Sequence, residues 1–156
     1  ASGATWAPNT ITYSGNNRTH MIRVPGPGRF ELRLMDGATN PYLLQAGILA
    51  AGIDGIEKKR NPGKPVYVNM YEESEKVKGA KKLPLTLEQS LSHLSKSKVL
   101  QNAFGKDIIN SYVRLKNREI KKYNSSIEKK IGFKGSKKTN KSSIITQWEK
   151  DNTLDC

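Results

Sequence analysis

Hydrophobic and polar residues alternate most regularly between residues 29 and 35. In an extended chain, neighbouring side chains point to opposite faces, so three apolar residues share one face: Phe30, Leu32 and Leu34. The opposite face carries Arg29, Glu31 and Arg33. The pattern therefore predicts a half-buried strand. Its apolar face is expected to enter a core, and its polar face sets a carboxylate between two guanidinium groups.

A second strand is predicted just upstream, over residues 19–24, with Thr19, Met21 and Arg23 on one face. The connection 25–28 reads Pro-Gly-Pro-Gly, which is typical of a tight turn. The two strands therefore form a predicted hairpin that brings Arg23 close to the polar face of the second strand.

The rest of the chain is predicted to be mainly helical. Asn40 and Pro41 are favoured residues for a helix N-cap and first turn, and the small and apolar residues of 42–56 indicate a mostly buried helix in which Tyr42 is a core residue. A polar loop is expected over 67–82. A capping box at 86–89 opens another helix, and an amphipathic helix is expected over 106–123.

Charge and cysteine content narrow the function only a little. The 156 residues carry a formal net charge of +13, with much of the lysine excess between Lys116 and Lys141. A small basic nucleic-acid-binding module stays open on this ground, although aromatic residues are not interleaved with the lysines as single-strand binders need. The single Cys156 fits a reducing cytoplasm, and no apolar run is long enough for a membrane span.

The arginines near the hairpin allow two interpretations. Arginine binds phosphate and carboxylate through paired hydrogen bonds, and a carboxylate among arginines suits a site for a divalent cation and phosphates. Cross-strand ion pairs on an ordinary surface explain the same pattern, and from periodicity alone they are the favoured interpretation.

The region from about Ala4 to Pro65 closely resembles the C-terminal part of the catalytic domain of glutamine synthetases. Short segments carry this resemblance in the expected order. They are Ala7-Pro8, Asn17-Arg18-Thr19, Ile22-Arg23-Val24-Pro25, Arg29-Phe30-Glu31-Leu32-Arg33, Asp36, Asn40-Pro41-Tyr42-Leu43, Ala50 to Ile56 and Pro62-Gly63. The resemblance implies an α+β fold in which antiparallel strands of a curved sheet are followed by packed helices. It also implies that the domain is incomplete.

The resemblance further implies an ATP-dependent ligase that uses Mg²⁺ or Mn²⁺ and joins glutamate to ammonia through a γ-glutamyl phosphate. By position, Arg18, Arg23 and Arg29 match arginines that face ATP phosphates, and Glu31 matches a metal ligand. Arg33 matches the arginine that meets glutamate, and Arg18 and Arg33 are the expected catalytic residues. A homo-oligomer in the cytoplasm is expected, with no nucleic acid and no membrane.

Two departures leave the amine open. The connection between Pro25 and Arg29 is short for the family, and Met35 replaces a common proline. Methylamine or a polyamine is therefore the alternative acceptor.

The other metal ligands and ATP contacts of the family have no counterpart in this chain, so we expect the chain to be inactive alone. His20 and His93 receive no catalytic role. The expected organisation is a catalytic-domain part over 1–123, a basic flexible segment over 124–143 and a C-terminal segment over 144–156.

Overall fold

The computed structural model describes residues 7–131 and 147–153. These residues form two compact units, and each is described by itself. Unit 1 holds residues 7–37 and 61–83, and unit 2 holds residues 38–60, 84–131 and 147–153.

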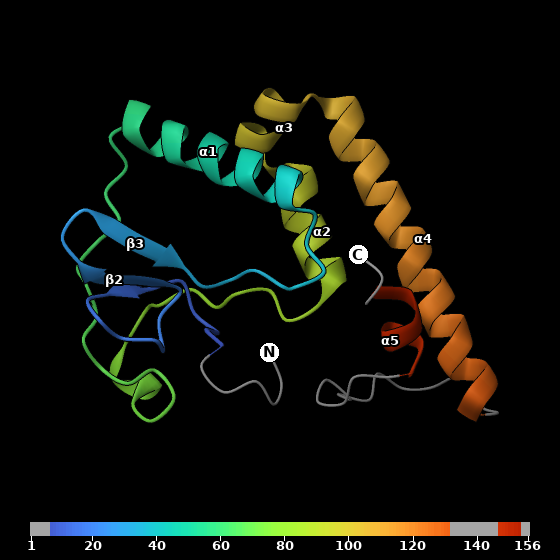
Figure 1. Cartoon of the computed structure of the whole chain (residues 1–156), viewed down its shortest axis with the longest axis horizontal. Coiled ribbons are helices and arrows are strands. Elements are labelled where there is room, and N and C mark those ends of the chain that lie inside the picture. The colour runs from blue at the N-terminus through green and yellow to red at the C-terminus, as the bar shows by residue number, and fades with distance from the viewer. Residues whose placement is uncertain (1–6, 132–146, 154–156) are drawn as a thin grey trace. The chain divides into compact units, whose positions relative to one another are not determined.

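Unit 1 is built on a three-stranded sheet in the order β1-β2-β3 (Figure 1). The strands are β1 (Tyr13–Ser14), β2 (Ile22–Gly26) and β3 (Arg29–Leu32), with β1 parallel and β3 antiparallel to β2. Gly28 has a φ of 78° in the turn between β2 and β3, a conformation that glycine adopts without strain. The predicted hairpin is confirmed.

The first hairpin strand starts later than predicted. Residues 18–21 form a turn and bend, and β2 begins at Ile22. The Asn17 side chain explains the difference, because its Oδ1 accepts hydrogen bonds from the Thr19 backbone N–H and hydroxyl at 3.0 and 2.8 Å. Such local bonds favour a turn over a strand ladder.

The segment 61–83 completes unit 1 by pairing with β1 and the residues before it. The backbone N–H of Ile11 donates to the carbonyl of Lys81 at 2.8 Å, and that of Val66 donates to the carbonyl of Tyr13 at 2.9 Å. The segment includes a short 3₁₀ helix, η1 (Ser74–Lys76), and the side chain of Met70, which is only 1% exposed. The predicted polar loop therefore supplies a core residue.

The apolar face of β3 does not enter a core within unit 1. Phe30 is 64% exposed and Leu34 is 43% exposed, whereas Leu32 is half-buried. The expectation that all three side chains enter a core is wrong for the described residues. The reason is that the small sheet has no layer of unit 1 packed over that face.

Unit 2 is helical. Its elements are α1 (Pro41–Glu57), α2 (Leu87–Lys96), α3 (Lys98–Phe104), α4 (Lys106–Ile131) and α5 (Gln147–Thr153). Helix α4 contacts both α2 and α3, and α1 contacts α3. Leu91 on α2 and Ile109 on α4 are each 4% exposed and form the buried centre.

The predicted helix starts are confirmed in atomic detail. The Asn40 side chain accepts from the N–H groups of Tyr42 and Leu43, both at 3.1 Å. The Thr86 hydroxyl accepts from the Gln89 N–H at 3.3 Å, and the Gln89 side chain accepts from the Leu85 N–H at 2.8 Å. The second bond is a variant of the capping box, because the glutamine reaches one residue beyond the N-cap.

Three features of unit 2 differ from the prediction. Helix α4 continues past Tyr123 to Ile131, so the start of the segment 124–143 is helical, and residues 132–143 lie outside the described residues. Helix α3 was not predicted, since its seven residues are too few to show a period. Helix α1 has no buried residue, and Tyr42 is 82% exposed, so the prediction of a mostly buried helix is wrong here.

The C-terminal helix α5 packs on α4 through aromatic rings. The rings of Tyr123 and Trp148 meet edge to face with centroids 5.4 Å apart. Trp148 is therefore a packing residue. None of the described helices has both the length and the apolar character that a bilayer span requires.

Candidate functional site

The register of the hairpin brings a guanidinium to a carboxylate. Arg23 on β2 lies directly opposite Glu31 on β3. Their side chains form an ion pair with 2.7 Å between Arg23 Nη1 and Glu31 Oε1, and only 13% of the Arg23 side chain is exposed. A charge-assisted bond at this distance on a half-covered surface fixes the position of both groups.

A second guanidinium approaches Glu31 from its own strand. Residues 31 and 33 share a face of the extended chain, and Arg33 Nη1 lies 3.7 Å from Glu31 Oε2. Arg33 Nε also donates to the backbone carbonyl of Arg18 at 3.2 Å. Arg23, Glu31 and Arg33 form what we call the hairpin cluster.

The two other predicted arginines border the hairpin cluster. The side chains of Arg18 and Arg29 are exposed. Arg29 is near enough for its charge to act on Glu31. Arg18 contributes its backbone carbonyl to the cluster, and its guanidinium makes no hydrogen bond or ion pair among the described residues.

The electrostatics of the hairpin cluster keep Glu31 ionised. The hydrogen bond from Arg23 is the largest cause that lowers the pKa of Glu31, and the charges of Arg23, Arg29 and Arg33 lower it further. At neutral pH the cluster therefore presents one carboxylate and a surplus of positive charge. Such a surface suits anionic ligands.

A buried hydrogen-bond network supports the turn that leads into β2. His20 is fully buried, with Nε2 3.0 Å from the Val68 carbonyl oxygen and Nδ1 2.9 Å from the Thr12 hydroxyl oxygen. Because a carbonyl only accepts, Nε2 carries the proton and Nδ1 accepts from Thr12. Burial lowers the pKa of His20 and outweighs the bond to Val68. His20 is thus a neutral structural residue.

Sequence reasoning missed Asn16. Its side-chain Oδ1 accepts hydrogen bonds from Arg23 Nε, at 2.9 Å, and from Arg23 Nη2. The asparagine therefore holds the guanidinium from the side away from Glu31. Asn16 lies in a Ser-Gly-Asn-Asn segment whose composition is typical of a turn, and only the long reach of Arg23 could have suggested a partner there.

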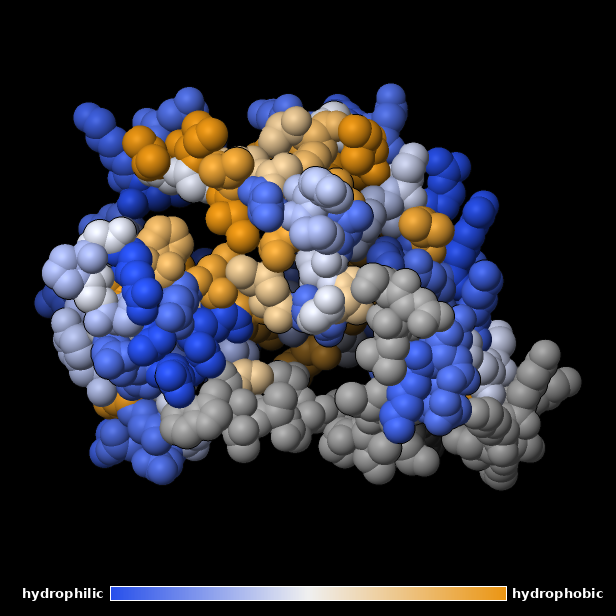
Figure 2. Space-filling model, viewed as in Figure 1, coloured by the Kyte–Doolittle hydropathy of each residue, from blue (hydrophilic) through white to orange (hydrophobic). Residues whose placement is uncertain are grey.

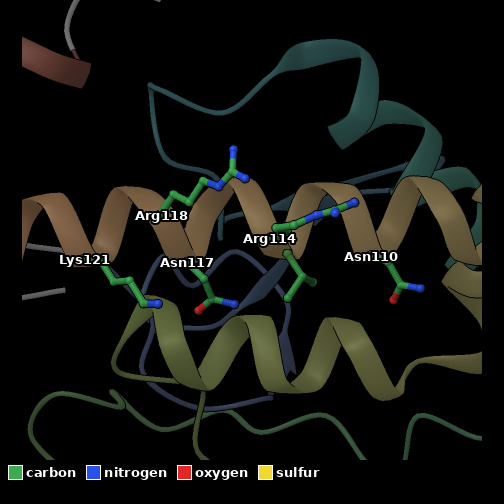
Figure 3. Close-up of a pocket in the computed structure, with 6 residues that line it drawn as sticks. Asn110, Arg114, Asn117, Arg118 and Lys121 are labelled. Carbon is green, nitrogen blue, oxygen red and sulfur yellow. The ribbon is translucent and has the colours of Figure 1, made fainter.

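A second basic surface lies on α4 (Figure 3). A shallow cavity of about 370 Å³ is lined by Asn110, Val113, Arg114, Asn117, Arg118 and Lys121. We call this set the α4 basic surface. Within the part of the chain that the structure describes, its three cations form no ion pair. It has no aromatic residue among its lining side chains, so it lacks the stacking groups of a single-strand binder.

The described residues do not make a complete metal site. No group of three or more histidine, cysteine, aspartate or glutamate side chains is gathered anywhere in residues 7–131 and 147–153. Both Glu31 oxygens face guanidiniums. The predicted Mg²⁺ or Mn²⁺ would therefore find a single carboxylate here, fewer ligands than a divalent cation takes.

The fold and the cluster define a class before any comparison. They describe an α+β chain whose hairpin gathers arginines around one carboxylate. The model of the family "Glutamine synthetase, catalytic domain" matches residues 2–131.

Individual relatives agree with this match. The glutamine synthetase of Rhizobium meliloti (strain 1021) is 47% identical over 154 residues, which are 99% of this chain and 31% of that protein. The glutamate–methylamine ligase of Methyloversatilis universalis is 45% identical over 125 residues, covering 78% of this chain and 28% of that ligase. A solved structure of a GmaS/ADP complex superposes with a TM-score of 0.74 at 44% identity, over 100% of this chain and 32% of that one.

The chain belongs to the glutamine synthetase catalytic-domain family and corresponds to a C-terminal portion of it. It spans about a third of the length of these relatives.

Proposed function

We propose that this chain is the C-terminal part of the catalytic domain of an ATP-dependent ligase that joins glutamate to ammonia. In this reaction a side-chain oxygen of glutamate attacks the terminal phosphorus of ATP, which gives γ-glutamyl phosphate and ADP. Ammonia then attacks the carbonyl carbon and loses one proton, and phosphate leaves with the bonding electrons and takes up a proton. The hairpin cluster is the observation that carries the proposal.

The arginines of the hairpin have the chemistry that this reaction needs. Negative charge moves between ATP, the glutamate carboxylate and the departing phosphate, and fixed guanidiniums stabilise such charge without rearrangement. We assign Arg18, Arg23 and Arg29 to the ATP phosphates and Arg33 to the glutamate side chain and its phosphorylated form. Arg18 and Arg33 are then the catalytic residues.

Glu31 is proposed as one ligand of the divalent cation. Its ionised state supports this role, because Mg²⁺ and Mn²⁺ prefer carboxylate oxygen. A bound cation would help to neutralise the phosphates. The remaining ligands would come from outside this chain, and the chain alone should therefore be inactive. In the complete enzyme we expect a homo-oligomer in the cytoplasm.

Methylamine is the second candidate for the amine. The observation that favours it is the likeness to the glutamate–methylamine ligase of Methyloversatilis universalis and to the GmaS structure. Ammonia is preferred because the sequence match to the Rhizobium meliloti glutamine synthetase extends over 99% of the chain, against 78% for the Methyloversatilis universalis ligase.

A graft tests the proposal. This chain replaces the matching segment of the Rhizobium meliloti enzyme, and we call the product the grafted enzyme. We expect it to release phosphate from ATP in the presence of glutamate and ammonia, with methylamine as the competing acceptor in a parallel assay. The isolated chain is the control and should release none. A folded grafted enzyme that is inactive with both amines would contradict the proposal.

A further inference from the structure

The polar residues of the α4 basic surface form a row along one side of the helix. At 100° per residue they fall within an arc of about 100°, and at 1.5 Å per residue the row is about 16 Å long. All of them are exposed, and Figure 3 shows their side chains leaving α4. The row consists of Asn110, Arg114, Asn117, Arg118 and Lys121.

Another side of α4 is already in use within unit 2. Ile109 is 4% exposed and Tyr112 is half-buried. Both line an apolar cavity of about 200 Å³ together with Leu94 of α2 and Phe104 of α3. The helix is therefore held in its unit by these residues, and this packing leaves the α4 basic surface exposed.

The polar groups of the α4 basic surface lack partners among the described residues. Its lining includes no aspartate or glutamate. Glu119, on the same helix, pairs with Lys116 at 2.8 Å instead. The amides of Asn110 and Asn117 make no hydrogen bond within residues 7–131 and 147–153. Hydrophilic residues prevail on the visible surface of α4 (Figure 2), so the helix presents water-facing charge without a neutralising carboxylate.

The groups in the lining match an acidic protein segment better than a nucleic acid. Guanidinium and ammonium groups bind carboxylates. An asparagine amide both donates and accepts, so it can pair with a peptide group, which also does both. Val113 is half-buried and offers an aliphatic contact. Phosphate oxygens accept but do not donate, and the lining has no aromatic ring on which a base could stack.

We propose that the α4 basic surface is a docking site for an acidic segment of a partner protein. The carboxylates of that segment would bind Arg114, Arg118 and Lys121, and its backbone would bind the two asparagines. The net charge of +13 would speed the encounter with an acidic partner and oppose self-association. This inference goes beyond the proposed ligase reaction, because no residue assigned to that reaction belongs to the α4 basic surface.

The test uses the isolated chain and a fluorescent peptide of about 20 residues, long enough to cover the row. The peptide contains alanine, glutamine and glutamate, with glutamate at every third or fourth position. Fluorescence anisotropy should show binding that weakens as salt is added. The double variant Arg114→Glu, Arg118→Glu should raise the Kd at least about tenfold, because like charges would then face each other.

The matched control is Lys64→Glu combined with Lys78→Glu. Both lysines are exposed residues of unit 1, and this pair changes the net charge by the same amount. The control should raise the Kd by less than about threefold, because exposed charges away from the contact act only weakly. Equal losses in the two double variants would overturn the proposal, since the attraction would then be general.

A second variant leaves the charge intact. Asn110→Ala combined with Asn117→Ala should raise the Kd by about three- to tenfold, since each amide would lose a hydrogen bond to the peptide. An unchanged Kd for this variant would overturn the assigned contacts. The proposal is also overturned if the parent chain binds the all-glutamine form of the peptide equally well, or binds a DNA duplex more tightly. Dimers of the parent chain that the double arginine variant dissociates would assign the surface to a second copy and overturn it too.

Discussion

The hairpin cluster and the α4 basic surface are built from similar residues and differ in what surrounds them. In the hairpin cluster, Arg23 and Arg33 both approach Glu31, and Asn16 holds Arg23 from the other side. On α4, Arg114 and Arg118 sit on successive turns of one helix and form no ion pair with any described residue.

The surroundings of a guanidinium, more than its charge, determine whether it can support specific chemistry. Paired strands and side-chain bonds fix the guanidiniums of the hairpin, so their geometry is set before a ligand arrives. The α4 arginines are long exposed side chains that lose conformational freedom whenever they bind. Total charge therefore says little about function, and the fixed carboxylate distinguishes the two surfaces.

The largest effect is expected from Arg33→Ala in the grafted enzyme. Removal of this guanidinium takes away a fixed positive charge from the proposed glutamate site. The rate of phosphate release should fall by roughly 10²-fold or more. Arg114→Ala, on the α4 basic surface, is the matched control and should keep the parent rate. Equal rates for the two variants would show that the hairpin cluster and the α4 basic surface do not differ in their contribution to phosphate release.

The buried network beneath the hairpin gives the next largest effect. His20→Ala removes two hydrogen bonds and leaves the Thr12 hydroxyl and the Val68 carbonyl without their partner. The free energy of unfolding should fall by about 2–4 kcal/mol, measured by urea denaturation of the isolated chain. Ser111→Ala on α4 is an exposed control. A loss below about 0.5 kcal/mol for His20→Ala would show that the network does not support the hairpin.

The same histidine makes stability depend on pH. Burial lowers the pKa of folded His20 from its ordinary 6.5, so the unfolded chain takes up the proton at a higher pH. Stability should therefore be full above a pH of about 7 and decrease as the pH falls through the ordinary pKa of histidine. Urea midpoints at a series of pH values measure this, and His20→Gln should flatten the curve over that range. An equally steep decrease in the variant would assign the effect to another group.

The smallest effect is expected from Arg114→Ala combined with Arg118→Ala. Exposed arginines without partners contribute little, so unfolding free energy should change by less than about 0.5 kcal/mol. The KM for ATP in the grafted enzyme should stay at the parent value. A clear rise in the KM for ATP would show that residues of α4 contribute to phosphate binding.

Local patterns in the sequence predicted the hairpin and the helix starts. The alternation in 29–35 and the Pro-Gly turn were sufficient to bring Arg23 close to the polar face of the second strand, and the exact pairing of Arg23 with Glu31 came from the structure. The N-cap roles of Asn40 and Thr86 could also be predicted, since capping depends on a few neighbouring residues.

Features that depend on distant residues could not be predicted in the same way. Met70 lies in a segment of polar composition, and its burial depends on the pairing of 61–83 with β1 and the residues before it. Asn16 gains its role from the direction in which Arg23 extends. The exposure of Tyr42 and Phe30 was not predicted, because hydrophobicity indicates only that a side chain tends to be buried. It does not indicate whether the residues that bury it belong to the same chain.

The central claim is that Glu31 serves a divalent cation among phosphate-binding arginines. Calorimetric titration of Mn²⁺ into the grafted enzyme and its Glu31→Gln variant tests it most directly. The account predicts at least a tenfold weaker Kd for the variant, because glutamine offers a neutral oxygen of similar shape in place of the carboxylate. An unchanged Kd together with unchanged phosphate release would contradict it and leave the hairpin cluster as an ordinary cross-strand ion pair.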